Sequence, residues 1–240
     1  MKYLFIILFY LILMPNTLAW NSKGHQAVVE TMYYAAEFEL QKKLNLTLLK
    51  EGSTAPDLVF HDVRSHHYPK SYPLAEKWIN DAKKNYENQD YNEASYAFGV
   101  ASHYISDSFV SPHYLSKEPG SLHSEFERIK SYNLSIKCYN SVVNLNESLK
   151  DATRNREDWT NWSLTKDPNI PRRELEQAIN LTFPVFLTTF NSTCNNFKTE
   201  IIKQNFKKND DVLIFISLTF ISYLSFILNR RYKMIKRIRF

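Results

Sequence analysis

The sequence predicts an all-α fold, in which a multi-helix domain is followed by one apolar segment near the carboxyl terminus. Apolar side chains recur at the three- and four-residue spacing of amphipathic helices along most of the chain. No stretch alternates convincingly with the period of two that is typical of strands. Four Gly and two Cys in 240 residues also argue against a turn-rich β fold, a disulfide scaffold and a four-thiolate zinc site.

Residues 1–19 are typical of a secretory signal peptide. A basic second residue precedes an uncharged apolar run that ends at Pro15, and small residues stand at Thr17 and Ala19. The apolar run is too short to span a bilayer comfortably. Cleavage after Ala19 would leave Trp20 as the first residue of the mature chain.

Helical spacing continues between the two ends of the chain. It predicts helices over residues 23–44, 73–88, 92–109, 120–149 (interrupted near Asn133) and 172–206. Residues 46–72, which contain Gly52 and Pro56, are predicted to be a long irregular connection. Pro184 is expected to kink the last helix.

The apolar segment 212–228 is predicted to be a transmembrane helix. Its seventeen residues carry no charge, which is the short limit for a membrane-spanning helix. Residues 229–240 contain six Lys and Arg, and basic residues directly after an apolar helix are typical of a stop-transfer signal with a cytoplasmic tail. We therefore expect a single-pass protein of the cell membrane, with the domain at 20–211 outside.

The formal charge of +5 is not a property of the predicted domain. Of the 30 Lys and Arg, one lies in the signal peptide and six lie in the tail, whereas all 25 Asp and Glu lie within 20–211, whose net charge is therefore −2. The basic balance belongs to the membrane anchor, so it does not indicate binding to nucleic acid.

Two further features are compatible with export. Sequons for N-glycosylation stand at Asn45, Asn133, Asn146, Asn161, Asn180 and Asn191, and in an Asn-rich chain several of them will be chance matches. Cys138 and Cys194 could form one disulfide in an oxidising compartment, or they could be two buried thiols.

Histidines and carboxylates are concentrated in the predicted helices over 92–109 and 120–149 and in the connection between them. His103 and Asp107 are four residues apart in a predicted helix, so they share one face, and His123 and Glu127 repeat this spacing. His113 lies between the two pairs. Imidazole and carboxylate are suitable zinc ligands, and pairs at i and i+4 can direct two of them at one ion. Further candidates lie upstream, at His25, Asp57, His61, Asp62, His66 and His67.

With these motifs, residues 20–130 resemble the zinc-dependent phospholipase C and S1/P1 nuclease superfamily of all-α trinuclear zinc phosphodiesterases. Members begin with a Trp whose amino nitrogen and carbonyl oxygen bind metal, which matches Trp20 after the predicted cleavage. The spacing from Trp20 to His25 is that of the nuclease branch. Asp57 matches an Asp in the following loop. His66, with His67 as the alternative, matches a His before the central helices.

The resemblance implies about three Zn²⁺ ions. Asp57, His66, His103 and Asp107 would hold one ion; His113, His123 and Glu127 a second; and Trp20, His25 and the far oxygen of a bridging Asp107 the third. Zinc ions that share a water lower its pKa and direct it at phosphorus. The catalytic acids would be Asp57, Asp107 and Glu127. A free amine as a ligand would also require exact removal of the signal peptide.

The resemblance implies a membrane-anchored phosphodiesterase that hydrolyses phospholipids on the glycerol side of the phosphate. Glu127 matches the phospholipase branch. Lys23 stands where that branch carries an acid for a choline head group, so a preference for choline is not implied. One alternative is an S1/P1-like nuclease or nucleotidase, and only then would nucleic acid be a substrate. Another is an inactive, zinc-stabilised binding domain. The sequence does not predict the oligomeric state.

Overall fold

The structure is a computed structural model that describes residues 22–62, 64–115, 120–128, 134–138 and 143–194. These residues form helices and contain no strand, which agrees with the predicted all-α class. Within these ranges, none of the helices is both long and apolar enough to cross a membrane. The predicted signal peptide, Trp20, transmembrane helix and basic tail lie outside the described residues.

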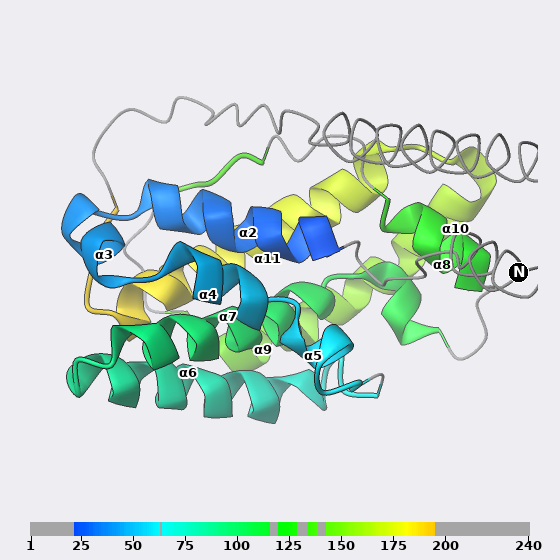
Figure 1. The fold of residues 1–240 in the computed structure, drawn as a ribbon. Coiled ribbons are helices and arrows are strands. Elements are labelled where there is room, and N and C mark those ends of the chain that lie inside the picture. The colour runs from blue at the N-terminus through cyan, green and yellow to red at the C-terminus, as the bar shows by residue number, and fades with distance from the viewer. Residues whose placement is uncertain (1–21, 63, 116–119, 129–133, 139–142, 195–240) are drawn as a thin grey trace, which may run out of the picture. The chain divides into compact units, whose positions relative to one another are not determined.

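Helix α7 (Tyr91–Asp107) is the central element of the domain. Asp90 caps its amino terminus by accepting a hydrogen bond from the backbone N–H of Glu93, at 3.2 Å. Its neighbours are α2 (Ser22–Ala35), α4 (Leu46–Gly52), α6 (Ser71–Glu87) and α11 (Asn169–Thr189), arranged as in Figure 1. Since other helices cover it, α7 is buried over most of its length. The predicted helices over 73–88 and 92–109 are confirmed as α6 and α7.

The predicted helix over 23–44 is wrong as one continuous element, because it is interrupted between α2 and α3 (Phe38–Lys43). At the interruption, Ala36 forms an isolated antiparallel bridge with Cys194. Cys194 is also bonded to Cys138 in a disulfide. The disulfide excludes the alternative of two buried free thiols. Together, the disulfide and the bridge join three distant parts of the chain, at residues 36, 138 and 194.

The prediction that residues 46–72 are irregular is wrong for their first part, which forms α4 and α5 (Ala55–Leu58). Asn45 caps α4 through the backbone N–H groups of Thr47 and Leu48. Gly52 is the last residue of α4 and allows this helix to approach α7 closely, since a Cβ atom on Gly52 would lie 2.2 Å from the carbonyl oxygen of Tyr96.

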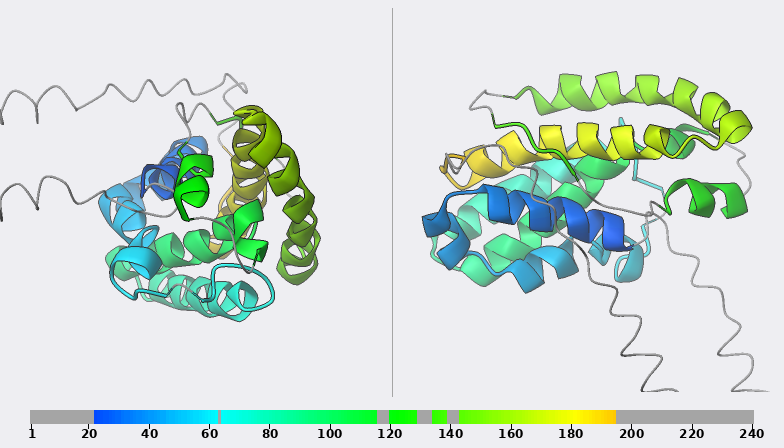
Figure 2. Two further views of the ribbon diagram at one scale, coloured as in Figure 1. Left: turned by 90° about the vertical axis from the view of Figure 1, so that its right-hand side faces the viewer. Right: turned by 90° about the horizontal axis from the view of Figure 1, so that it is seen from above.

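Residues 120–149 do not form the single interrupted helix that the spacing predicted. They contain α8 (Gly120–Phe126) and the start of α9 (Leu145–Ala152), and residues 134–138 between them are not helical. A 3-10 turn, η2 (Thr153–Asn155), then leads into α10 (Arg156–Thr165). Figure 2 shows α9 and α10 running alongside α11. Pro184 lies inside α11, which continues to Thr189.

One end of the helix bundle gathers the segments that carry the predicted site. The carboxyl end of α7, the first turns of α2, α5 and the short helix α8 lie together there (Figure 1). Another 3-10 turn, η1 (Ser111–Tyr114), is separated from the end of α7 by three residues and packs against α10. The fold therefore brings residues from 25 to 127 to one place.

Candidate metal centre

Asp107 lies at the centre of a buried cluster and is 0% exposed. Its Oδ1 is 3.2 Å from Nε2 of His25. Its Oδ2 is 3.2 Å from Nε2 of His103 and 2.7 Å from Nδ1 of His66. The four residues come from α2, α7 and the loop after α5. Both oxygens of one carboxylate are therefore engaged by imidazoles, on different sides.

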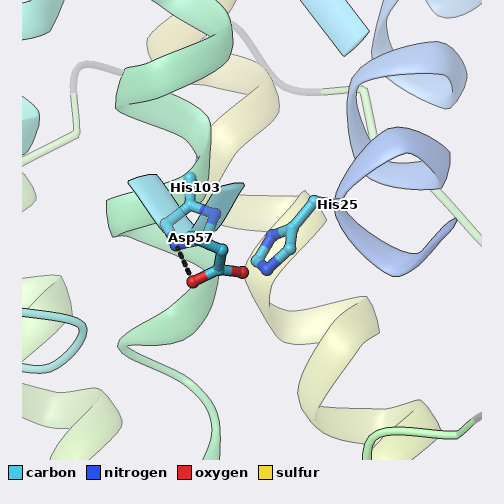
Figure 3. Close-up of side chains that lie close together, drawn as sticks. All are labelled: His25, Asp57 and His103. Atoms are coloured by element: carbon cyan, nitrogen blue, oxygen red, sulfur yellow. Dashed lines mark ion pairs between the residues drawn. The ribbon is translucent and has the colours of Figure 1, made fainter. Parts of the chain in front are cut away.

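Asp57 on α5 extends this cluster. Its Oδ1 lies 3.6 Å from Nε2 of His66 and 3.6 Å from Nε2 of His103. Figure 3 shows the Asp57 carboxylate between His103 and His25, whose rings stack with their centroids 4.1 Å apart. The Asp57 side chain is 13% exposed, whereas that of Asp107 is fully buried. Asp57 is therefore the more accessible of the two carboxylates.

A second group lies next to the first. Nε2 of His123 is 2.7 Å from Oε1 of Glu127, and Nε2 of His113 is 3.4 Å from the same oxygen. His113 also connects the two groups, since its Nδ1 is 3.9 Å from Oδ2 of Asp107. The four-residue spacing of His123 on α8 and Glu127 directly after it predicted this contact, and the turn η1 supplies His113.

The tautomers of three histidines follow from their hydrogen bonds. Nδ1 of His103 lies 2.9 Å from the carbonyl oxygen of Ser53, and Nδ1 of His113 lies 3.1 Å from that of Asp107. A carbonyl oxygen only accepts, so both Nδ1 atoms carry the proton. Nδ1 of His25 is 3.0 Å from the Ser106 hydroxyl, which itself donates to the carbonyl oxygen of His103. In the neutral imidazoles, Nε2 is therefore an unprotonated atom that faces the carboxylates.

This arrangement fits a cation. Nε2 of His66, Nε2 of His103 and both Oδ atoms of Asp107 are buried without a hydrogen-bond partner among the described residues. Lone pairs of imidazole and carboxylate that face one another at about 3 Å repel, unless a proton or a metal ion lies between them. Second hydrogen bonds that hold the outer nitrogen are typical of metal-binding histidines. The donor set, nitrogen with carboxylate oxygen, suits zinc.

The charges in the cluster shift its titration. Burial alone would raise the pKa of Asp107, but His103, His25 and His113 hold that pKa well below its ordinary value. Burial would lower the pKa of His66, yet the Asp107 carboxylate, 2.7 Å from its Nδ1, and the charge of Asp57 raise it to about 9. In the absence of a metal, His66 therefore carries a proton at neutral pH.

The structure brings together eight of the nine predicted ligands. Three groups have ligand atoms that all lie within 4.8 Å of one another: His25, Asp57 and His103; His66, Asp107 and His113; and His113, His123 and Glu127. The last group is the set expected for one zinc ion. The first two divide the other residues differently from the expected sets. Trp20, the ninth predicted ligand, lies outside the described residues.

Two histidines singled out from the sequence do not enter the cluster. His67 lies edge-on to the ring of Tyr114, with the centroids 5.3 Å apart, so the fold directs His66 and not His67 toward Asp107. His61 is exposed, has a φ of 51°, and places Nδ1 3.2 Å from the backbone oxygen of Asp57. Ser53 and Ser106, which orient the ligands, were missed because their partners are 50 and 81 residues away.

The fold and the site define a class of protein: an all-α domain whose buried cluster of His and carboxylate side chains is suited to binding zinc. The family model of zinc-dependent phospholipase C matches residues 24–192, which is most of the chain. The chain therefore belongs to the zinc-dependent phospholipase C family. A search of curated protein sequences finds no significant match.

Proposed function

We propose that this protein is a zinc-dependent phosphodiesterase that hydrolyses phospholipids. The observation that carries the proposal is the position of Asp107, whose two buried oxygens face three imidazoles. A buried carboxylate among imidazoles is costly unless a proton or a metal cation compensates its charge. Membership of the family supports zinc as that cation.

The eight described candidates would hold zinc as the resemblance assigns them. Asp57, His66, His103 and Asp107 would bind one ion; His113, His123 and Glu127 a second; and His25 with the other oxygen of Asp107 a third, together with Trp20. When bound, zinc supplies Lewis acidity that lowers the pKa of water and neutralises charge on phosphoryl oxygens. Asp107 would bridge two ions, since its Oδ1 and Oδ2 face different histidines.

The three carboxylates would have different roles in the reaction. Asp107 and Glu127 are buried and surrounded by histidines that lower their pKa, so they would remain ionised and act as zinc ligands. Asp57 is partly exposed at the same cluster. We assign it the role of proton acceptor, at its carboxylate oxygens, for the water that attacks the phosphate.

An exposed apolar segment beside the centre favours a lipid over a nucleic acid. Leu58, Val59 and Phe60 directly follow Asp57 and are 44%, 64% and 40% exposed. A phosphodiester that reaches Asp57 would place the adjoining part of the substrate near this segment. Diacylglycerol chains or a lipid surface would bury these side chains, with a gain of about 25 cal/mol per Å². The polar sugar of a nucleic acid gives no such gain.

One observation supports the nuclease alternative. The ring of Phe60 stacks on that of Trp78, with centroids 5.9 Å apart and planes inclined by 10°. Exposed aromatic rings are typical platforms for unstacked bases. Lys77 adds a cation over the Trp78 ring, with Nζ 4.2 Å from its centroid. The nuclease or nucleotidase therefore remains the competing function.

The location is also part of the proposal and is supported by sequence alone. Residues 212–228 would span the cell membrane once, the domain at 20–211 would lie outside, and residues 229–240 would lie in the cytoplasm. Such an anchor would hold the phosphodiesterase next to a lipid surface. Removal of residues 1–19 would expose the amine of Trp20 as a ligand.

The test uses the full chain, purified in detergent after its signal peptide is processed and then loaded with zinc. It is incubated separately with phosphatidylcholine vesicles, with vesicles that also contain an anionic phospholipid, and with single-stranded DNA. We expect release of a phosphorylated head group from at least one type of vesicle. Cleavage of DNA alone would overturn the proposal in favour of the nuclease.

A further inference from the structure

We infer that Glu174 of α11 is a positioning residue for the metal centre, which acts by holding the turn that carries His113. This inference rests on the zinc centre of the proposed function and not on the identity of the substrate. Glu174 is 0% exposed, and its Oε2 accepts a hydrogen bond from the backbone N–H of Ser111, at 3.0 Å. Ser111 is the first residue of η1 and precedes His113 by two positions.

Within the turn, the bond to Glu174 has a clear physical reason. His113 and Leu115 donate their backbone N–H groups to the carbonyl oxygens of Val110 and Pro112. Pro112 has no N–H to donate. The N–H of Ser111 stands at the start of the turn, where helical turns leave donors without an internal partner. Because Ser111 is completely buried, this donor needs a protein acceptor, and Glu174 provides it.

Other contacts hold the same connection between the ligands Asp107 and His113. Nδ2 of Asn155 donates to the carbonyl oxygen of Phe109 at 2.9 Å. The hydroxyl of Tyr114 donates to the carbonyl oxygen of Ser108 at 2.5 Å. Asn155 precedes α10, and Glu174 lies on α11. Residues beyond 150 thus fix the backbone of the connection, although none of them is a candidate ligand.

The carboxyl group itself is costly to bury. Oε1 of Glu174 has no hydrogen-bond partner among the described residues. Burial raises the pKa of Glu174 well above its usual range, and the N–H of Ser111 only partly opposes this. An apolar side chain would avoid the cost, but it would leave the Ser111 N–H buried and unpaired. The bond to the turn is therefore the contribution that Glu174 makes.

A displaced turn would affect zinc directly. His113 lies between Asp107 and Glu127, and its Nε2 is 3.4 Å from the Glu127 carboxylate. Metal affinity falls steeply when a ligand loses its support, by about 10- to 100-fold in comparable cases. Glu174 should therefore govern how tightly the group of His113, His123 and Glu127 binds zinc.

The test compares Glu174→Leu, Glu174→Asp and Glu174→Gln in the full chain. Leu removes the acceptor, Asp shortens its reach, and Gln keeps an amide oxygen in the same place. The matched control is Thr182→Val, since Thr182 lies on the same helix, is equally buried, and bonds only to Ala178 of its own helix in the described residues. The readouts are zinc per chain after dialysis against a competing chelator, and the rise in Tm on adding zinc.

We expect zinc affinity to fall about 10- to 100-fold in Glu174→Leu, less in Glu174→Asp, and to return to near the wild-type level in Glu174→Gln. The control should lose some stability and keep its zinc. Wild-type zinc affinity in both Leu and Asp variants, or a Gln variant as weak as Leu, would overturn the inference. Failure of the wild-type chain itself to bind zinc would instead overturn the proposed function.

Discussion

Nε2 of His103 lies 3.2 Å from Oδ2 of Asp107, one helical turn along α7, with both side chains completely buried. The other imidazole nitrogen, Nδ1, donates its N–H to the backbone carbonyl oxygen of Ser53. The lone pairs of His103 Nε2 and Asp107 Oδ2 are thus held side by side in the interior. This arrangement is stable when a cation lies between the two atoms. The chemistry proposed for this protein depends on this pair.

Asp107→Asn should weaken zinc binding by at least about 100-fold and abolish phosphodiester hydrolysis, because the amide removes a charge and one ligand oxygen that faces the histidines. Metal analysis and assays on vesicles measure the two effects. Asp81→Asn is the control, since Asp81 lies on the exposed part of α6 and pairs with Lys77. Normal turnover in Asp107→Asn would contradict the bridging role.

The stability of the zinc-free protein should depend on pH through His66. Its pKa rises from 6.5 to about 9 in the folded state, so its charged form stabilises the fold fully below pH 6.5. This contribution should be lost as the pH rises through 9. Zinc binds the neutral form of His66, so the increase in stability on adding zinc should grow as the pH rises over the same range. Thermal unfolding with a chelator and with zinc, from pH 6 to 10, measures both trends.

His66→Gln should remove most of this pH dependence. The carboxyl group of Asp107 has a lowered pKa, so its ionised form stabilises the fold fully above pH 3.8, the ordinary pKa of an Asp. This contribution is lost only on acidification. It therefore does not mask the change between 6.5 and 9. A zinc-free Tm that stays constant across that interval in the wild-type protein would be inconsistent with the described cluster.

Val59→Ser should lower activity on phospholipid vesicles about tenfold, because burying this side chain against lipid is worth about 1.5 kcal/mol. It should leave hydrolysis of a water-soluble nitrophenyl phosphodiester unchanged. Leu164→Ser is the matched control, since Leu164 is 81% exposed on α10 and is not part of the apolar segment after Asp57. Equal effects of the two substitutions on vesicles would remove this support for a lipid substrate.

Gly99→Ala should destabilise the fold by about 1–3 kcal/mol, since its Cβ would lie 2.3 Å from the carbonyl oxygen of Leu49 and force α4 away from α7. Gly120→Ala is the control, because a Cβ there would have no heavy atom within 4 Å. Its effect should stay within about 0.5 kcal/mol. Chemical denaturation gives both values, and similar losses at the two sites would argue against close helix contact.

The sequence predicted those features that depend on local spacing. The pairs His103 with Asp107 and His123 with Glu127 are separated by one turn, so the helical period alone places each pair on one face. The helices α6 and α7 were found in the same way. Helix α4 was missed, because Gly52 was interpreted as a breaker and its close contact with Gly99 joins positions 47 residues apart.

The remaining features depend on tertiary contacts. The choice of His66 over His67 follows from how the loop after α5 lies on α7, which no local pattern encodes. Among the described residues, the hydrogen bond of the Glu174 side chain is to Ser111, 63 residues away, and not to its own helix. Nothing in the spacing of α11 distinguishes this acid from Glu176, which pairs with Arg172. Such long-range partners become visible only when the helices pack.

The zinc content of the purified, processed full chain tests the central claim most directly. Metal analysis after dialysis against zinc-free buffer should give about three zinc ions per chain, and Asp107→Asn should retain fewer. An extra residue placed before Trp20 should remove one ion. A wild-type protein that retains no zinc, or that binds it equally well after Asp107→Asn, would contradict the account of the buried cluster as a metal centre.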